Sequence, residues 1–206
     1  MRETKLILLI ITMFTMLGCA STTPATAVKT GHGPKMHSAP NLDNVPKPKY
    51  SRTIMDNVDI FRSMNFKTWK GLYNCVLAFD KSYQSVTYDY VIEYTEWFNN
   101  IVWYFGLNEI KGQYDCDNIA QLYKAVMSTS IYKKHSDHEI LVGFLIVSQK
   151  NDFGGIPGYG DSNKIILHAL NVAHTEKGWI VIEPQTGVIV PLRDYPNKDY
   201  IQKIIL

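Results

Sequence analysis

The sequence carries little net charge and few cysteines, has no long apolar run, and each shortage excludes a class of protein. Its 206 residues include 21 basic and 19 acidic side chains, for a net charge of +2. Because so small a charge creates no strong positive field, we predict no nucleic-acid partner. A chain of this length with three cysteines is too long for a disulfide-stapled miniprotein. No apolar stretch approaches the roughly 20 residues of a membrane-spanning helix.

Apolar side chains are nevertheless plentiful. Hydrophobic residues make up 46% of the sequence and aromatic residues 12%. Such a chain can bury a core, which excludes wholesale disorder. No internal repeat is visible, so we expect one folded domain with additional segments.

The first 18 residues have the pattern of a signal peptide. Leu6 to Leu17 are apolar apart from two threonines, and these twelve residues would form a helix of roughly 18 Å, which is too short to span a bilayer. The run ends at Gly18-Cys19, which resembles a bacterial lipobox, although Met16 stands where the family prefers Leu and Leu17 where it prefers a small residue.

The lipobox resemblance implies diacylglyceryl transfer to Cys19, cleavage before it, and anchoring by several acyl chains such as palmitate. The predicted partner is then a lipid bilayer, and the predicted location is the bacterial cell envelope. By the family's sorting tendency, Ala20 indicates the outer membrane if the host has one. The alternative is an ordinary secretory signal, cut after Ala20 or after Ala27.

Residues 19–49 are predicted to form a flexible tether. They contain five of the nine prolines and no aromatic residue, so they cannot bury enough surface to offset the entropy of ordering. The sequence has two pairs of closely spaced histidines, which are His32 with His37 and His135 with His138. Neither pair is accompanied by a second pair of metal-ligating residues that would complete a site. We therefore predict no metal and no cofactor.

Residues 50–206 read as a helical half followed by a strand half. The last predicted helix has the clearest periodicity and an N-cap at Asp115 or Asp117. Gly and Pro mark the break at 184–187. Helices followed by strands predict an α+β fold, with N-terminal helices packed on an antiparallel sheet. The predicted helices cover Ile54–Met64, Tyr83–Phe105 and Ile119–Met127, and the predicted strands cover Ile140–Val147, Lys164–Val172, Trp179–Glu183 and Val188–Leu192.

Cys116 opens the clearest helix and shares the inward face of Ile119. The N-terminus of a helix favours a thiolate, which is the reactive form of a nucleophilic cysteine. Asp115 and Asp117 oppose this effect, because neighbouring negative charge disfavours a thiolate. A cationic partner is therefore required.

That partner is predicted on the following strands. If Ala173 to Gly178 close a hairpin, Val172 faces Trp179 and His168 faces Glu183. Opposed side chains have Cβ atoms about 4.5–5.5 Å apart. A carboxylate at that distance can hold one imidazole nitrogen and leave the other free to accept a proton from a thiol. The predicted catalytic residues are therefore Cys116, His168 and Glu183.

Asp115-Cys116-Asp117, running into Ile119-Ala120, resembles the nucleophile segment of transglutaminase-like and papain-like cysteine enzymes. His168-Ala169, followed by the stretch 178–184, resembles their histidine and acid segments, and the order Cys, His, acid is also theirs. The resemblance covers about residues 110–190. Glu183 departs from the pattern, since transglutaminase-like members usually have Asp and papain has Asn. A fainter similarity exists to papain-like domains attached to some fungal lectins, which use Glu.

This resemblance implies a papain-like or transglutaminase-like fold and a membrane-anchored cysteine hydrolase, such as a thiol protease, or an acyltransferase that forms a thioester. The implied substrate is protein or a peptidoglycan peptide. The oxyanion donor stays open between the Cys116 backbone N–H and a side chain such as Gln113 or Gln185. Two alternatives stay open as well: a non-catalytic envelope lipoprotein that serves as a binding module, and a structural lipoprotein with a Cys75–Cys116 disulfide.

Overall fold

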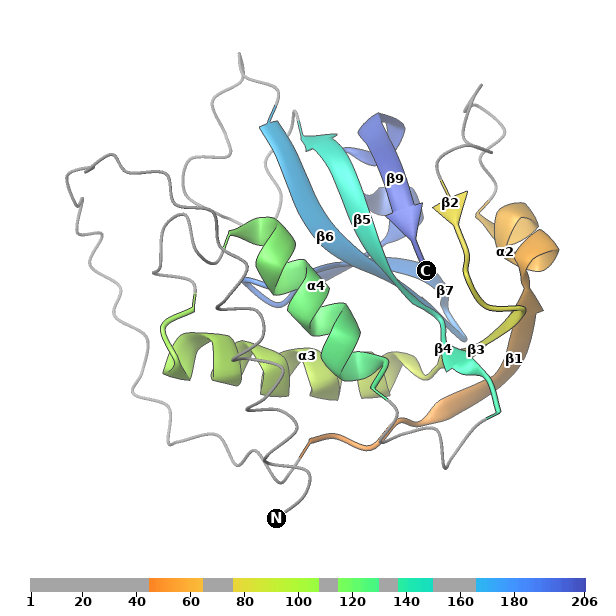
Figure 1. Cartoon of the computed structure of the whole chain (residues 1–206), viewed down its shortest axis with the longest axis horizontal. Coiled ribbons are helices and arrows are strands. Elements are labelled where there is room, and N and C mark those ends of the chain that lie inside the picture. Colours follow the sequence, from red (N-terminus) through yellow and green to blue (C-terminus); the bar gives the residue numbers. More distant parts are fainter. Residues whose placement is uncertain (1–44, 65–75, 108–114, 130–136, 150–165) are drawn as a thin grey trace.

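The structure is a computed structural model that describes residues 45–64, 76–107, 115–129, 137–149 and 166–206. In this part of the chain, nine strands form one sheet and three α-helices pack around it (Figure 1). The strands are β1 (Tyr50–Asp56), β2 (Val76–Leu77), β3 (Ser82–Val86), β4 (Glu139–Ile140), β5 (Val142–Gln149), β6 (Ile166–Thr175), β7 (Gly178–Glu183), β8 (Val188–Pro191) and β9 (Ile201–Ile205). The helices are α2 (Asn57–Ser63), α3 (Tyr88–Tyr104) and α4 (Cys116–Met127), with 3₁₀ turns η3 (Leu192–Asp194) and η4 (Lys198–Tyr200).

The sheet is mixed rather than antiparallel. Its main path runs β1-β3-β6-β5-β9-β2, and β7 and β8 extend from β6. Strands β2 and β9 pair in parallel, as do β3 and β4, and β3 and β6. Three of the strands precede α3 in the chain. The predicted α+β fold of the papain-like or transglutaminase-like kind, with N-terminal helices on an antiparallel sheet, is therefore wrong.

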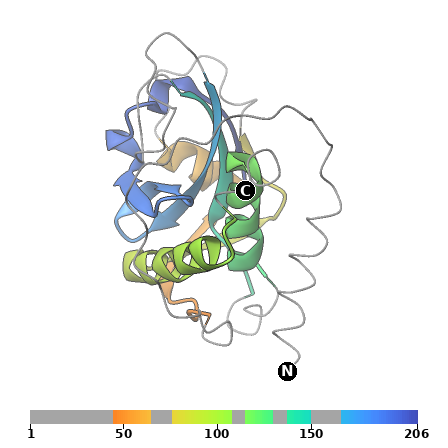
Figure 2. The same cartoon turned by 90° about the vertical axis from the view of Figure 1, so that its left-hand side faces the viewer.

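The two longer helices pack against the same part of the sheet. In Figure 1, α4 lies beside β6 and slopes in the same direction, and α3 runs below α4; Figure 2 shows both helices in the view turned by 90°. Their shared core is aromatic: the Tyr94 and Tyr123 rings meet edge to face, with centroids 4.9 Å apart, and the Tyr94 hydroxyl donates to the Tyr123 carbonyl. Tyr90, Tyr94 and Phe98 of α3 are therefore core residues.

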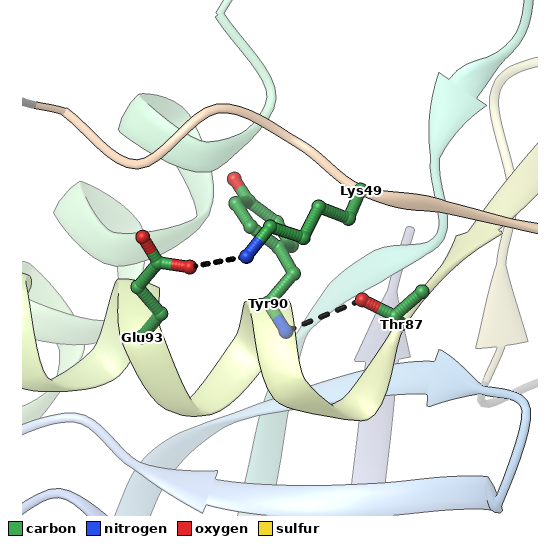
Figure 3. Close-up of polar contacts among 4 residues, drawn as sticks. All are labelled: Lys49, Thr87, Tyr90 and Glu93. Carbon is green, nitrogen blue, oxygen red and sulfur yellow. Dashed lines mark hydrogen bonds and ion pairs between the residues drawn. The ribbon is translucent and has the colours of Figure 1, made fainter.

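The first turn of α3 lies next to Lys49, just before β1. Thr87 is its N-cap, with a side-chain oxygen that accepts from the Tyr90 N–H at 3.3 Å (Figure 3). The Thr87 N–H donates to the Lys49 carbonyl at 2.7 Å, and Lys49 Nζ lies 2.7 Å from Glu93 Oε2. The segment just before β1 is therefore fixed to the first turn of α3.

The hairpin of β6 and β7 differs in register from the prediction. Thr175 pairs with Gly178 around a two-residue turn, and Val172 faces Val181 instead of Trp179. The Thr175 hydroxyl accepts from the Lys177 N–H and donates to the Gly178 carbonyl. This local bonding centres the turn one residue later than predicted, which shifts the cross-strand partner of each residue by two. Because the error is an even number of residues, every side chain stays on its predicted face.

The described helices were also searched for membrane spans. None of them is long and apolar enough to cross a bilayer.

Candidate functional site

Helix α4 is held closely against β5 and β6. The Asn171 side chain, fully buried in β6, donates from Nδ2 to the Ala120 carbonyl at 2.9 Å and to the Gly143 carbonyl at 3.2 Å. Ala120 and Ala169 are small residues that face each other in a cluster with Phe144, and Cys116 packs against this cluster. These contacts set the position of the first residue of α4.

The structure brings Cys116, His168 and Glu183 close together, although His168 does not lie directly opposite Glu183 as the predicted register had it. The Cys116 side chain lies close enough to His168 to raise the pKa of the imidazole, and His168 Nε2 lies 2.6 Å from Glu183 Oε2. Both side chains of the His–Glu pair have no solvent exposure. The second oxygen of Glu183 accepts from the Gln185 N–H at 3.1 Å, so both carboxylate oxygens have a donor.

The surroundings of His168 favour its protonated form. Burial lowers its pKa, but the hydrogen bonds to Cys116 and Glu183 and the negative charge of both partners outweigh burial and raise the pKa to about 9. At neutral pH the imidazole therefore holds a proton, with Glu183 beside it as counter-ion. Cys116 itself is a free, half-buried cysteine, so the predicted alternative of a Cys75–Cys116 disulfide is not formed.

Two acidic residues flank the cysteine. Asp115 is the N-cap of α4, although its side chain makes no capping hydrogen bond. Asp117 is hydrogen-bonded to Asp115, and this bond, together with burial and the charge of Asp115, raises the pKa of Asp117 to about 6. The two carboxyl groups therefore share a proton only below about that pH.

Other predicted site residues lie apart from the triad or outside the described residues. Gln185 reaches Glu183 through its backbone N–H. His138 Nδ1 lies 2.8 Å from Ser82 Oγ. Within the described ranges, no group of three His, Cys, Asp or Glu side chains could hold a metal ion. The remaining candidates, which are Cys19, His32, His37, Cys75, Gln113 and His135, fall outside the described residues.

Asn171 was missed by the sequence analysis. Its side chain joins α4 to two strands, and it therefore positions Cys116. The signal was present, because a polar amide between Leu170 and Val172 interrupts an apolar run. A buried amide in such a place needs a hydrogen-bond partner from a neighbouring element.

A separate pocket of about 620 Å³ lies between α3 and the turn before β8. One flank is a single face of α3, and the other is the turn and the first part of β8. Gly187, with φ of +78°, brings that turn close to α3, and an added Cβ would lie 3.2 Å from Asn99 Oδ1. The pocket is lined by Tyr88, Ile92, Thr95, Glu96, Asn99, Asn100, Trp103, Thr186, Gly187 and Ile189.

Comparison with known proteins gives few matches. No family model and no curated protein matches the chain. Similar solved structures include a complex of PSL1a with E64, at 15% identity and a TM-score of 0.45, which covers 74% of this chain and 50% of that one. Another is the Polyporus squamosus lectin bound to the human-type influenza-binding epitope Neu5Acα2-6Galβ1-4GlcNAc, at 17% identity and a TM-score of 0.40, covering 64% of this chain and 42% of that one.

These comparisons correct the predicted family. Membership of the transglutaminase-like or papain-like cysteine enzymes is withdrawn, because no family model matches the chain and the described sheet is mixed rather than antiparallel. The predicted assignment as a papain-like thiol protease or hydrolase is abandoned with it. The chain spans half or less of the length of the two similar structures. At such low identity and TM-score, the likeness carries no argument about activity, so any function must be argued from the side chains.

Proposed function

We propose that Cys116, His168 and Glu183 form a thiol-based acyl-transfer site. The observation that carries the proposal is the position of His168, which lies beside the Cys116 side chain and is hydrogen-bonded, at 2.6 Å, to the buried Glu183 carboxylate. In this arrangement Cys116 is the nucleophile, His168 the proton carrier and Glu183 the group that orients the ring and stabilises its charge.

The proposed chemistry has two balanced steps. The proposed starting state is a Cys116 thiolate beside protonated His168; the sulfur forms a bond to an acyl carbon, and the bond from that carbon to the leaving group breaks as His168 gives the leaving group its proton. An acceptor then loses a proton to His168 and bonds to the acyl carbon of the thioester. The carbon–sulfur bond breaks, and the sulfur leaves as a thiolate. A pKa near 9 suits His168 for the acid role in the first step.

The proposed acyl donors are protein or peptidoglycan peptides of the cell envelope. This part of the proposal depends on the predicted anchor at Cys19 and the predicted tether of residues 19–49, of which residues 19–44 lie outside the described residues. A tethered domain would keep its thiol site near such donors at high effective concentration.

Acyl-enzyme trapping tests the proposal. The protein without residues 1–18 is incubated with p-nitrophenyl acetate, and intact-mass and peptide mass spectrometry locate the added acetyl group. We expect acetylation of Cys116 in the wild type, none in Cys116→Ala, and unchanged labelling in the matched thiol control Cys75→Ala. Acetylation of Cys116 at the same rate in His168→Ala would contradict activation by the imidazole.

The second candidate function is a binding module without catalysis, which the pocket beside α3 favours. That pocket contains none of the three triad residues. A protein whose Cys116 never forms an acyl adduct but whose pocket binds a ligand would be such a module. Acyl trapping together with ligand titration therefore separates the two candidates.

A further inference from the structure

The pocket beside α3 is lined by aromatic, acidic and amide side chains. Its α3 flank carries Tyr88, Ile92, Glu96, Asn100 and Trp103. Positions i, i+4, i+8, i+12 and i+15 of a helix lie on one face. The face therefore presents two aromatic rings at its ends, with a carboxylate and amides between them.

The two aromatic residues are not equally available. Lys177 Nζ sits 3.9 Å from the centroid of the Tyr88 ring, and the Tyr88 N–H is bonded by Glu176. Trp103 is 37% exposed, and no ring or cation contact of its own is recorded with another described residue. Its indole face is therefore the free apolar plane of the pocket.

The polar side chains indicate what kind of ligand fits. No side-chain hydrogen bond or ion pair joins Glu96 or Asn100 to another described residue, and the two side chains offer carboxylate and amide groups to the pocket. No Lys or Arg belongs to the described lining, and Glu96 is its one charged side chain. Such a lining disfavours phosphate and other anions, and it suits hydroxyl groups that both donate and accept.

The turn on the other flank is held in place. Asn99 Nδ2 donates to the Pro184 carbonyl at 2.6 Å, and Gly187 permits the close approach of the turn to α3. A pocket that is already formed binds its ligand without the cost of ordering a loop.

We propose that this pocket binds an uncharged saccharide, with the apolar face of a sugar ring on Trp103 and its hydroxyl groups hydrogen-bonded to Glu96 and Asn100. The inference gives the ligand class of the second candidate function and rests on that function. It does not depend on acyl transfer by Cys116.

Saturation-transfer NMR with Cys116→Ala protein tests the inference while keeping acyl chemistry out of the experiment. The ligands are methyl glycosides of glucose, galactose, mannose and N-acetylglucosamine at millimolar concentration. We expect transfer to at least one glycoside and about tenfold weaker binding after Trp103→Ala, since an aromatic contact contributes on that scale. Glu96→Gln should weaken the binding of the same glycoside. Phe105→Ala is the matched control, because Phe105 is 42% exposed at the same helix end and does not line the pocket.

Binding to none of the glycosides, or equal weakening by Phe105→Ala, would overturn the inference. A parallel panel of short peptides and inorganic phosphate separates its failure from that of the binding function. If a peptide binds in a Trp103-dependent way and no glycoside does, the saccharide assignment is wrong and the binding module stands. If nothing binds, both are wrong.

Discussion

His168 and Glu183 are bonded at 2.6 Å although they do not face each other across β6 and β7. The observed register, in which Val172 pairs with Val181, places Leu170 opposite Glu183 and makes His168 its diagonal neighbour. Diagonal neighbours on one sheet face lie about 7–8 Å apart, which two long polar side chains can span. The two residues therefore meet because their side chains lie on the same face of the sheet and are long enough to reach each other diagonally.

Substitutions in the triad should rank in a defined order. Cys116→Ala should abolish acyl transfer, and His168→Ala should reduce it about 10²–10⁴-fold, because proton transfer is lost. Glu183→Gln should cost less, since an amide can still orient the ring but cannot stabilise its charge. The measurement is the rate of p-nitrophenol release under single-turnover conditions. The effects of His168→Ala and Cys116→Ala should not add, because the two residues act together. Full activity in Glu183→Ala would contradict the proposed role of Glu183 in acyl transfer.

Protonation of His168 should stabilise the fold. Its pKa rises from about 6.5 in the unfolded chain to about 9 in the folded one, so the stabilisation is complete below about pH 6.5 and is lost as pH rises through 9. Urea unfolding of the wild type should therefore show a loss of free energy over that window that His168→Gln does not show. Parallel pH profiles for the two proteins would disprove the shift.

Asp117 should give a pH dependence of the same sign as His168, but at lower pH. Its pKa is raised from 3.8 to about 6 by the bond to Asp115, burial and the Asp115 charge. Ionisation therefore costs the folded state stability as pH rises from about 4 through 6. Asp117→Asn should be more stable than the wild type above about pH 6 and equal to it near pH 4, by thermal unfolding. The control is Asp137→Asn, because Asp137 is exposed, and we expect no such pH-dependent difference in stability from the wild type.

Gly143 in β5 leaves no room for a side chain. A Cβ there would lie 2.8 Å from Leu206 Cδ2, 3.0 Å from Val172 Cγ1 and 3.2 Å from the Ile205 carbonyl oxygen. Gly143→Ala should therefore destabilise the protein by about 1–3 kcal/mol through overpacking. Urea titration provides the value, and Ser148→Ala on the same strand, which is half-buried, should change it less. An unchanged midpoint for Gly143→Ala would show that Leu206 moves aside freely.

Modification of Cys19 stays a prediction from the sequence. Intact-mass measurement of protein purified from bacterial membranes should show a chain that starts at Cys19 and carries acyl chains. A mature chain that begins at Ser21 or Val28 with no acyl mass would support the ordinary secretory signal instead.

The C-terminal half of the domain was readable because its signals are local. Helix α4 was predicted from five apolar residues at helical spacing, and it forms with Asp115 as its N-cap. The parity of His168 and Glu183 was also readable, since alternation fixes the face of a strand. The exact register was not, because the Thr175 hydroxyl bonds set the turn and no apolar pattern reports them.

In the N-terminal half, the prediction of a helix over Ile54–Met64 from the spacing of apolar residues was partly wrong. Ile54 and Val58 belong to a helical spacing, yet they are 50% and 52% exposed and do not form a core face. The buried residue of α2 is Ile60, and Ile54 lies in β1. Strand β9 was missed because it pairs with β5 and β2, which are distant in sequence. Such pairing leaves no mark on a short local pattern.

The attachment of Lys49 at the start of α3 also has a mechanical consequence. A pull on the chain from upstream meets the Thr87–Lys49 hydrogen bond and the Lys49–Glu93 ion pair first, and then the pair of Tyr50 with Val86 at the same end of β1. The bonds would break one after another, as in peeling, rather than all together. Tension on the leading segment would therefore strip β1 from β3 before it reached the strands that carry His168 and Glu183.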